Sequence, residues 1–525
     1  MPLTDLIIEM DLGEPILDSQ DRPILDSQDR IILDSDWVSV TSDAVQDPIH
    51  IRRGIFSTDF KDRVADTGTL TLTLNNSAAN SAGLMGYYSL DHANRRAYFG
   101  NSTRARINMK RASDYYKFQG RLSDIQIEAG LLNPKRTYVT VADWMDVAAR
   151  TPMPKLPILQ NVRDDQVIQT ILNAISEAPF ETSLALGGYA YPYALTDVRE
   201  GDTKIIGVLS SLMLSGLGRV FVKGGPTSGE ILTYIDIYWQ VNLDEQAPIA
   251  VFNDSMLKTT AQRKAFQRIK RATVRVYPMQ SDGVLVTLYN LSTSIRIPAG
   301  EAITFTGTYT DPNTGRSVSA LDARTPVADD DYKFSSLDGV GNDLNGDLVV
   351  EQFSTSTNSA SVTLRNTGVQ DGYLWFYRVQ GYALYSYDAL DYTIADDTIP
   401  EAEGGTYEYQ MPYQGDYNVA RDYGRMFLYW LGIESTNMPT IEFNGGQNTK
   451  AIDWAVEAEP GTLVEVSESV TGISRLFMVL GYDMEIRSKN DIPVTLYVTP
   501  VLSGSFCKLD VVGLAELDTN AILGV

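Results

Sequence analysis

Cysteine and histidine are almost absent from this sequence. One cysteine, Cys507, and two histidines, His50 and His92, occur among 525 residues. One thiol cannot form an intramolecular disulfide, and three such residues cannot supply a four-ligand Cys/His zinc site. The shortage also removes most arrangements in which a histidine activates a nucleophile. We expect Cys507, in the alternating run SGSFCKLDVV, to be a buried strand thiol, and both histidines to be structural.

Long apolar runs are also missing. The first residues, MPLTDLIIEMDLGEP, contain no basic segment followed by an apolar one, and 18 uninterrupted apolar residues occur nowhere. A standard secretory signal and a membrane-spanning helix are therefore not expected. We predict a chain that is made and folded in a cytoplasm, without membrane insertion.

Basic residues are fewer than acidic ones, 43 against 67, which gives a formal charge of −24. A general affinity for nucleic acid or anionic membranes is therefore disfavoured. The segment KTTAQRKAFQRIKRATVR, residues 258–275, is an exception without acidic residues. It predicts either a solvated face that meets acidic neighbours, or a subunit contact or lumen lining exposed to a polyanion. Its cations are Lys258, Arg263, Lys264, Arg268, Lys270, Arg271 and Arg275.

Short alternating segments rich in Thr, Val, Ile, Leu and Tyr dominate the chain and predict a mainly β (α+β) fold. In GTLTLTLNN, for example, Leu70, Leu72 and Leu74 share one face of a half-buried strand. Residues 219–239 read as a hairpin. Helical spacing predicts helices within 161–179, 203–216 and 419–432.

These patterns divide the chain into five expected domains. They are an acidic repeat arm (1–36), a first β-barrel (37–150), an α+β domain with the basic stretch (151–275), an inserted β-sandwich (276–408), and a late helix with a second β-rich barrel (409–525). The expected architecture is thus two tube-like barrel modules with an intervening α+β piece and an inserted sandwich.

Motifs that would carry chemistry are weak. Asp343, Asn345 and Asp347 follow the opening of an EF-hand loop, but Leu348 and Ser354 stand where glycine and glutamate are required. No phosphate-binding loop, nucleophile elbow, zinc-protease or dinucleotide fingerprint occurs. We therefore expect no catalytic residues, metal or cofactor, and no enzyme.

Aromatic residues offer one further binding hypothesis. Tyr373, Trp375 and Tyr377 alternate along one predicted strand and would share a face. Exposed stacked rings could bind sugars, whereas alternating aromatics more often fill a sandwich core or a seam between subunits.

The stretch PILDSQDRPILDSQDRIILDSD, residues 15–36, repeats an eight-residue phrase. A period of eight does not fit an α-helical stripe, and three such units cannot form a core alone. They predict either an extended arm that docks on a neighbouring subunit or partner protein, or a flexible acidic leader. The docking residues of the arm would be the apolar pairs Ile16 and Leu17, Ile24 and Leu25, and Ile32 and Leu33.

Six landmarks, taken in order, resemble the central hub proteins of tailed-bacteriophage tail tips and baseplates. They are DRVADTGTLTLTLNN, KFQGRLSDIQIEAG with RTYVTVADWMDVAAR, LPILQNVRDDQVIQTIL, the helix and hairpin of 205–236, IKRATVRVYP, and YQGDYNVARDYGRMFLYWL. Together they cover most of residues 37–525. Each motif is short, so the resemblance depends on their order.

The resemblance implies a structural virion protein in the phage tail tip. Three copies would form a ring joining the sixfold tail tube and distal tail protein to the tip. The implied partners are the tape-measure protein, receptor-binding or fibre proteins, and DNA in the channel. The competing interpretations are a carbohydrate-binding adhesin and a glycoside hydrolase with two carboxyl groups facing each other across a cleft.

Overall fold

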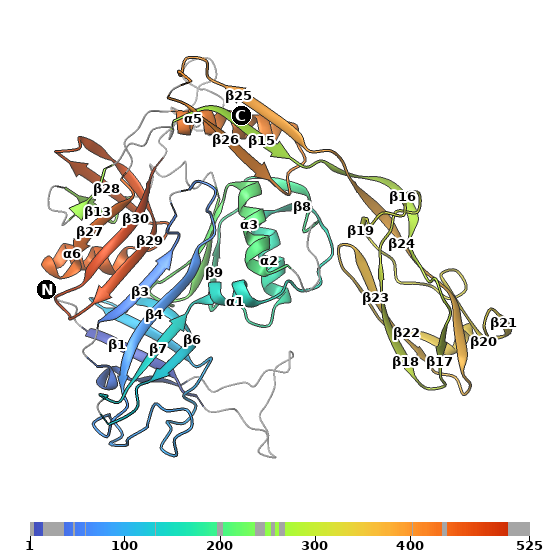
Figure 1. Cartoon of the computed structure of the whole chain (residues 1–525), viewed down its shortest axis with the longest axis horizontal. Coiled ribbons are helices and arrows are strands. Elements are labelled where there is room, and N and C mark those ends of the chain that lie inside the picture. Colours follow the sequence, from blue (N-terminus) through green and yellow to red (C-terminus); the bar gives the residue numbers. More distant parts are fainter. Residues whose placement is uncertain are drawn as a thin grey trace.

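The computed structural model describes residues 5–13, 36–45, 48–57, 59–131, 133–196, 203–236, 247–253, 258–261, 268–401, 403–432 and 438–501. Strands greatly outnumber helices among them, which confirms the predicted mainly β fold. A broad sheet lies beside a helical layer, a smaller sheet sits above, and a long β module projects away (Figure 1). Cys507, Arg263, Lys264 and the repeat lie outside the described residues.

The largest sheet contains thirteen strands from both ends of the chain. The order of its main path is β14, β27, β30, β29, β3, β4, β7, β6, β5, β1, β2, while β28 pairs with β29 and β13. The bounds are β1 (Asp5–Asp11), β2 (Trp37–Ser39), β3 (Ile49–Gly54), β4 (Asp66–Asn75), β5 (Arg104–Lys110), β6 (Tyr116–Ile127), β7 (Arg136–Ala142), β13 (Ala250–Phe252), β14 (Lys258–Thr259), β27 (Thr440–Asn444), β28 (Leu463–Glu468), β29 (Ile473–Ile486) and β30 (Pro493–Pro500).

This pairing changes the expected picture of two separate barrels. Among the described strands no sheet closes on itself, and early strands pair directly with late ones. The early and late strands meet where β3 pairs with β29 in an antiparallel ladder. The ladder begins with Ile49 opposite Ile486 and ends with Gly54 opposite Gly481. The alternation in β4 behaves as predicted, because Leu70, Leu72 and Leu74 are all buried in the shared core.

Two glycines allow the early and late strands to approach each other. Gly54 has φ +115°, and a Cβ at this position would lie 2.3 Å from the carbonyl oxygen of Leu480. A Cβ on Gly481 would lie 2.8 Å from the carbonyl oxygen of Arg53. Both strands also carry a register shift at this point in their pairing with β4 and β30. The sheet is therefore continuous only because no side chain intervenes here.

The helical layer follows the first strands. It contains α1 (Trp144–Arg150), α2 (Asp164–Ala174) and α3 (Ile205–Gly216), with the short strands β8 (Leu159–Arg163), β9 (Glu181–Leu184), β10 (Ala190–Ala194), β11 (Arg219–Lys223) and β12 (Ile231–Ile235). Val167, Ile168 and Ile171 of α2 face a core shared with α3. The helices predicted within 161–179 and 203–216, and the hairpin of β11 and β12, are confirmed.

A three-stranded sheet with one covering helix lies above this layer (Figure 1). Its strands are β15 (Ile269–Val276), β25 (Leu390–Ala395) and β26 (Gly405–Met411), and α5 (Tyr417–Gly432) packs on them. The late helix predicted over 419–432 is confirmed by α5. A further helix, α6 (Thr449–Glu457), packs against the core of the largest sheet.

The projecting module has two sheets around its own core. The first contains β16 (Met279–Asn290), β17 (Ile295–Ile297), β19 (Ser319–Leu321), β20 (Tyr332–Leu337), β21 (Val340–Asp343) and β24 (Gly372–Ser386); the second contains β18 (Ala302–Thr308), β22 (Leu348–Thr355) and β23 (Ser359–Asn366). The strands β16 and β24 connect it to the body (Figure 1).

The aromatic residues of β24 do not share one face as predicted. Leu374 and Tyr377 are buried, whereas Trp375 is 38% exposed. The register against β20 shifts here, because Phe334 pairs with Leu374 and Lys333 with Phe376. Trp375 is therefore bulged, and the period-two alternation that grouped it with Tyr377 is broken.

The amino-terminal residues are part of the largest sheet. β1 pairs with both β5 and β2, and Ile8 and Met10 are buried in the core. The backbone N–H of Leu12 donates to the carbonyl of Asp36 at 3.0 Å. The chain thus leaves the sheet and re-enters it at one place, on either side of the repeat.

Replacement of Gly54 by alanine should destabilise the protein by about 3 kcal/mol or more, because strain at positive φ is added to a backbone clash. Gly283→Ala is the matched control, since Gly283 has φ +70° but no heavy atom lies within 4 Å of the place that its Cβ would occupy. The control should cost only about 1–2 kcal/mol. Equal losses in chemical denaturation would show that the close contact between β3 and β29 is unimportant.

Candidate functional site

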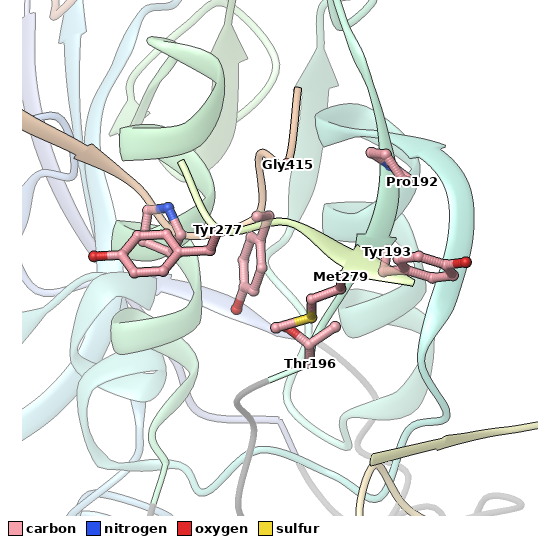
Figure 2. A pocket seen from close by; sticks show the side chains of 8 residues that line it. Pro192, Tyr193, Thr196, Tyr277, Met279 and Gly415 are labelled. Atoms are coloured by element: carbon pink, nitrogen blue, oxygen red, sulfur yellow. The ribbon is translucent and has the colours of Figure 1, made fainter. Parts of the chain in front are cut away.

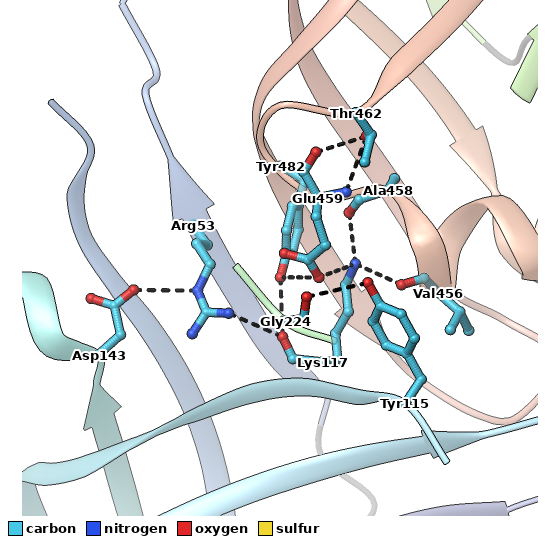
Figure 3. A network of polar contacts seen from close by, with 10 residues as sticks. All are labelled: Arg53, Tyr115, Lys117, Asp143, Gly224, Val456, Ala458, Glu459, Thr462 and Tyr482. Atoms are coloured by element: carbon cyan, nitrogen blue, oxygen red, sulfur yellow. Dashed lines mark hydrogen bonds and ion pairs between the residues drawn. The ribbon is translucent and has the colours of Figure 1, made fainter. Parts of the chain in front are cut away.

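A buried network of charged side chains joins the two ends of the chain. It links β3, β6 and α1 to the late segment around β28 and β29 (Figure 3). Arg53, Lys117, Asp143 and Glu459 are each at most 1% exposed. Charges this deep require close partners, since removal from water costs several kcal/mol for each ion.

Lys117 is the centre of this network. Its Nζ lies 2.8 Å from Oε1 of Glu459, and it also donates to the carbonyls of Val456 at 3.1 Å and Ala458 at 2.7 Å. The ammonium group lies 4.2 Å from the ring centroid of Tyr482. Burial lowers the pKa of Lys117, and the charge of Glu459 opposes this shift. The side chain of this lysine, which belongs to an early strand, therefore makes these contacts with residues from the late part of the chain.

Arg53 extends the network toward α1. Its Nε lies 3.2 Å from Oδ2 of Asp143, and its Nη1 donates to the carbonyl of Lys117 at 3.2 Å. Asp143 is also the N-cap of α1, where it accepts from the backbone N–H of Met145 at 3.1 Å, and it accepts from Gly68 at 2.9 Å. The carboxylate of Asp143 thus binds the start of α1, the backbone of Gly68 in β4 and the guanidinium of Arg53 in β3.

A second buried carboxyl group lies at the first residue of α2. The hydroxyls of Tyr191 and Tyr234 donate to Asp164 at 2.6 and 2.9 Å. Burial raises the pKa of Asp164 to about 7, although the two tyrosine hydrogen bonds oppose the shift. This side chain organises the helical layer from the first residue of α2, whose N-cap is Arg163.

The basic segment contains several intramolecular ion pairs. The ammonium of Lys258 lies 3.3 Å from the carboxylate of Glu442. Arg268 lies 3.6 Å from Glu403, and Lys270 lies 2.8 Å from Glu401. Arg275 makes two hydrogen bonds with Asp391, at 2.6 and 2.7 Å. Arg271 is exposed on the same strand. These contacts match the first hypothesis, in which the cations meet acidic neighbours.

One pocket lies where the helical layer, the upper sheet and the root of the projecting module meet (Figure 2). It encloses about 250 Å³ of space not filled by atoms, part of it open to solvent. The lining is uncharged: Pro192, Tyr193, Thr196, Tyr277, Met279, Pro412, Tyr413 and Gly415. No carboxyl, imidazole or cationic group lines it, so it offers no acid–base pair.

The remaining sequence motifs occupy ordinary positions. The side chain of Asp343 accepts from the N–H of Asn345 at 2.9 Å, and Asn345 accepts from Phe334 at 2.6 Å. His50 and His92 are exposed. Within the described ranges, no three His, Cys, Asp or Glu side chains gather as metal ligands. No described helix is both long and apolar enough to cross a bilayer.

The sequence does not reveal the buried network, because its members lie far apart along the chain. Asp143, just before the helix in VADWMDVAAR, is the one local signal, since aspartate is a favoured N-cap. Lys117 sits between Tyr116 and Phe118 in a strand, where a lysine ordinarily faces solvent. Nothing near it in the sequence indicates that Glu459 covers it.

No protein-family model and no curated protein sequence matches the chain. Among solved structures, it is similar to a tail protein from Neisseria meningitidis MC58 (8% identity, 94% of this chain and 95% of that chain, TM-score 0.46). It is also similar to the 43 kDa tail protein of prophage MuSo2 from Shewanella oneidensis (8% identity, 89% of this chain and 95% of that chain, TM-score 0.44). A third similar structure is prophage tail protein gp18 from Listeria monocytogenes EGD-e (9% identity, 94% of this chain and 94% of that chain, TM-score 0.38).

Replacement of Lys117 by methionine should cost about 3–5 kcal/mol, because Glu459 would keep a buried charge without its cation. Lys110→Met is the control, since Lys110 and Asp114 form a comparable ion pair that is largely exposed, and it should leave stability unchanged. Urea denaturation at pH 7 measures both. Similar midpoints for the two variants would contradict a structural role for the buried pair.

Asp164 should make stability depend on pH. Its pKa is about 7 in the folded protein, above the ordinary value of 3.8, so the folded state holds the proton more tightly. Its contribution is complete below about pH 4 and is lost as the pH rises to about 7, by up to about 4 kcal/mol. Asp164→Asn should remove this slope and gain stability relative to wild type between pH 5 and 8. If the free energy of unfolding changes with pH equally in wild type and in Asp164→Asn, Asp164 is not the source of the pH dependence.

Proposed function

We propose that this chain is a structural protein of a phage tail, and that it forms the central hub of the tail tip. The hub would join the tail tube and distal tail protein to the tip and its receptor-binding parts. The virion would be its final location, after assembly in the cytoplasm of the bacterial host.

The order of the sequence landmarks supports this proposal. DRVADTGTLTLTLNN contains β4, KFQGRLSDIQIEAG contains β6, and RTYVTVADWMDVAAR contains β7 and α1. The later landmarks contain α2, then α3 with the β11 and β12 hairpin, then β15, and finally α5. Each landmark therefore covers an element of the kind that the resemblance implies, in the same order, although Tyr116 of β6, the last two residues of α2 and Gly432 of α5 lie just outside their landmarks.

The joint between the two ends of the chain is the single observation that carries the proposal furthest. A hub must transmit force between a tube above and a tip below without coming apart. Here β3 and β29 are hydrogen-bonded partners, and Lys117 and Glu459 form a buried ion pair across the same joint. Such a joint resists separation, because opening it would leave two charges unpaired.

We propose the following partners for this hub. Three copies would form the ring, in contact with the tail tube, the distal tail protein, the tape-measure protein, and receptor-binding or fibre proteins. The five sequence-defined segments would be its domains, with the module of residues 276–408 facing outward. Among the described cations of the basic segment, Arg271, exposed on β15, is the one that we propose for contact with a second subunit or with DNA in the channel.

The native mass tests the proposal directly. Sedimentation equilibrium of the full chain should give three times 58.0 kDa, and negative-stain images should show rings. Denaturation in urea followed by dilution separates trimer from aggregate, because a specific ring reforms at the same mass. A stable monomer that binds glycans would refute the hub and favour the adhesin.

A further inference from the structure

Two arginines with buried side chains lie next to each other where the first strands meet the helical layer. Arg63 precedes β4 and is 2% exposed, and Arg219 begins β11 and is 5% exposed. Val64 and Val220 form a parallel β-bridge, and both pack in the core of the helical layer. Because side chains alternate along extended segments, both arginines point to the face opposite to the two valines. Two positive charges therefore share one buried face.

The charges of these two guanidinium groups act on each other. Burial and the charge of Arg63 together lower the pKa of Arg219 to about 9. Burial also lowers the pKa of Arg63. Among the described residues, the groups that most oppose this second shift are the hydroxyls of Tyr409, Tyr407 and Tyr423, and not carboxylates. Like charges repel more strongly where water is excluded, so this pair of arginines favours a negative charge beside it.

The backbone holds only one nitrogen of the Arg63 guanidinium. Nη1 donates to the carbonyl of Leu217, at the end of α3, at 2.6 Å, and lies 3.5 Å from the carbonyl oxygen of Gly218. The guanidinium also lies 4.0 Å from the ring centroid of Phe60. Nε and Nη2 are buried, and neither completes a hydrogen bond with the described residues. Both nitrogens are donors only, so they require an acceptor.

Two tyrosines of β26 bring further donors to the same place. Tyr407 and Tyr409 share one face of the strand, their rings stack with centroids 6.2 Å apart, and both pack on Phe427 of α5. Burial raises the pKa of Tyr409 to about 12, and the charges of Arg63 and Arg219 oppose this shift, so its hydroxyl lies near both arginines. Neither tyrosine hydroxyl completes a hydrogen bond with the described residues. Their O–H groups are therefore available to an acceptor.

The chemistry of this donor set selects a small anion. A water molecule would accept hydrogen bonds here, but it would leave the charges of both guanidiniums unbalanced. A doubly charged ion is disfavoured among aromatic rings, because the cost of removal from water rises with charge. Nζ of Lys61, which is exposed, lies 5.4 Å from the ring centroid of Tyr407 and extends the positive charge to the surface. Asp59, the carboxylate that acts on both tyrosines, is exposed.

We propose that Arg63, Arg219, Tyr407 and Tyr409 bind a small monovalent anion such as chloride between the helical layer and the upper sheet (Figure 1). Nε and Nη2 of Arg63 and the two tyrosine hydroxyls donate to the ion, and its negative charge balances the paired guanidiniums. Because β11 belongs to the helical layer and β26 to the upper sheet, the ion ties these two parts of the chain together. This inference does not depend on the proposed hub.

A chloride titration of the full chain tests the site. At constant ionic strength, replacement of sodium gluconate, whose anion is too large for the site, by sodium chloride should raise the urea midpoint of wild type, because an ion that binds only the folded state stabilises it. Tyr409→Phe keeps the ring beside Phe427 but removes one donor. It should raise the chloride concentration for half of the effect at least about tenfold, the loss expected for one hydrogen bond to a charged group. Arg63→Met should abolish the effect.

The matched control is Arg296→Met, since the Arg296 side chain is 60% exposed and pairs with Asp371. It should respond to chloride as wild type does. Crystals soaked in sodium bromide should show an anomalous peak beside Nη2 of Arg63 and the hydroxyl of Tyr409. The inference is overturned if chloride and gluconate give wild type the same midpoint, if Tyr409→Phe responds to chloride like wild type, or if bromide occupies only other places.

Discussion

The buried contact between Lys117 and Glu459 is the interaction on which the rest of the structure depends. It holds an early strand against a late segment where both side chains are buried, so separation of the pair would leave two charges without their counter-ions away from water. Arg53 and Asp143 extend the same network to the start of α1. The largest sheet, the helical layer and the carboxyl-terminal strands thus share one set of polar contacts.

This arrangement separates rigid parts from peripheral ones. The strands around the β3 and β29 pair have a continuous core and a charge network. The module of β16 to β24 has its own core, and it meets the helical layer through a small cluster of Ile158, Leu321 and Leu384 and two hydrogen bonds to the carbonyls of Leu195 and Thr196. The module is therefore a separately packed unit that is attached to the rest of the chain by few contacts.

Charge is divided unevenly along the chain. Residues 76–136 contain ten basic and four acidic side chains, whereas the repeat and the projecting module are acidic. Intramolecular pairs neutralise several cations of β15, including Arg275 with Asp391. Unpaired exposed charges act over a longer range than apolar contacts, and salt screens them.

The sequence by itself determined the local elements. Alternation placed Leu70, Leu72 and Leu74 in the core, and helical spacing located α2, α3 and α5, because both signals depend on neighbouring residues alone. It failed at Trp375, where a bulge interrupts the alternation, and it suggested separate barrels, whereas described strands from both ends of the chain pair in one thirteen-stranded sheet. Only the tertiary structure decided that Gly54 meets Gly481 and that Lys117 meets Glu459, because these contacts join residues whose sequence neighbourhoods carry no record of each other.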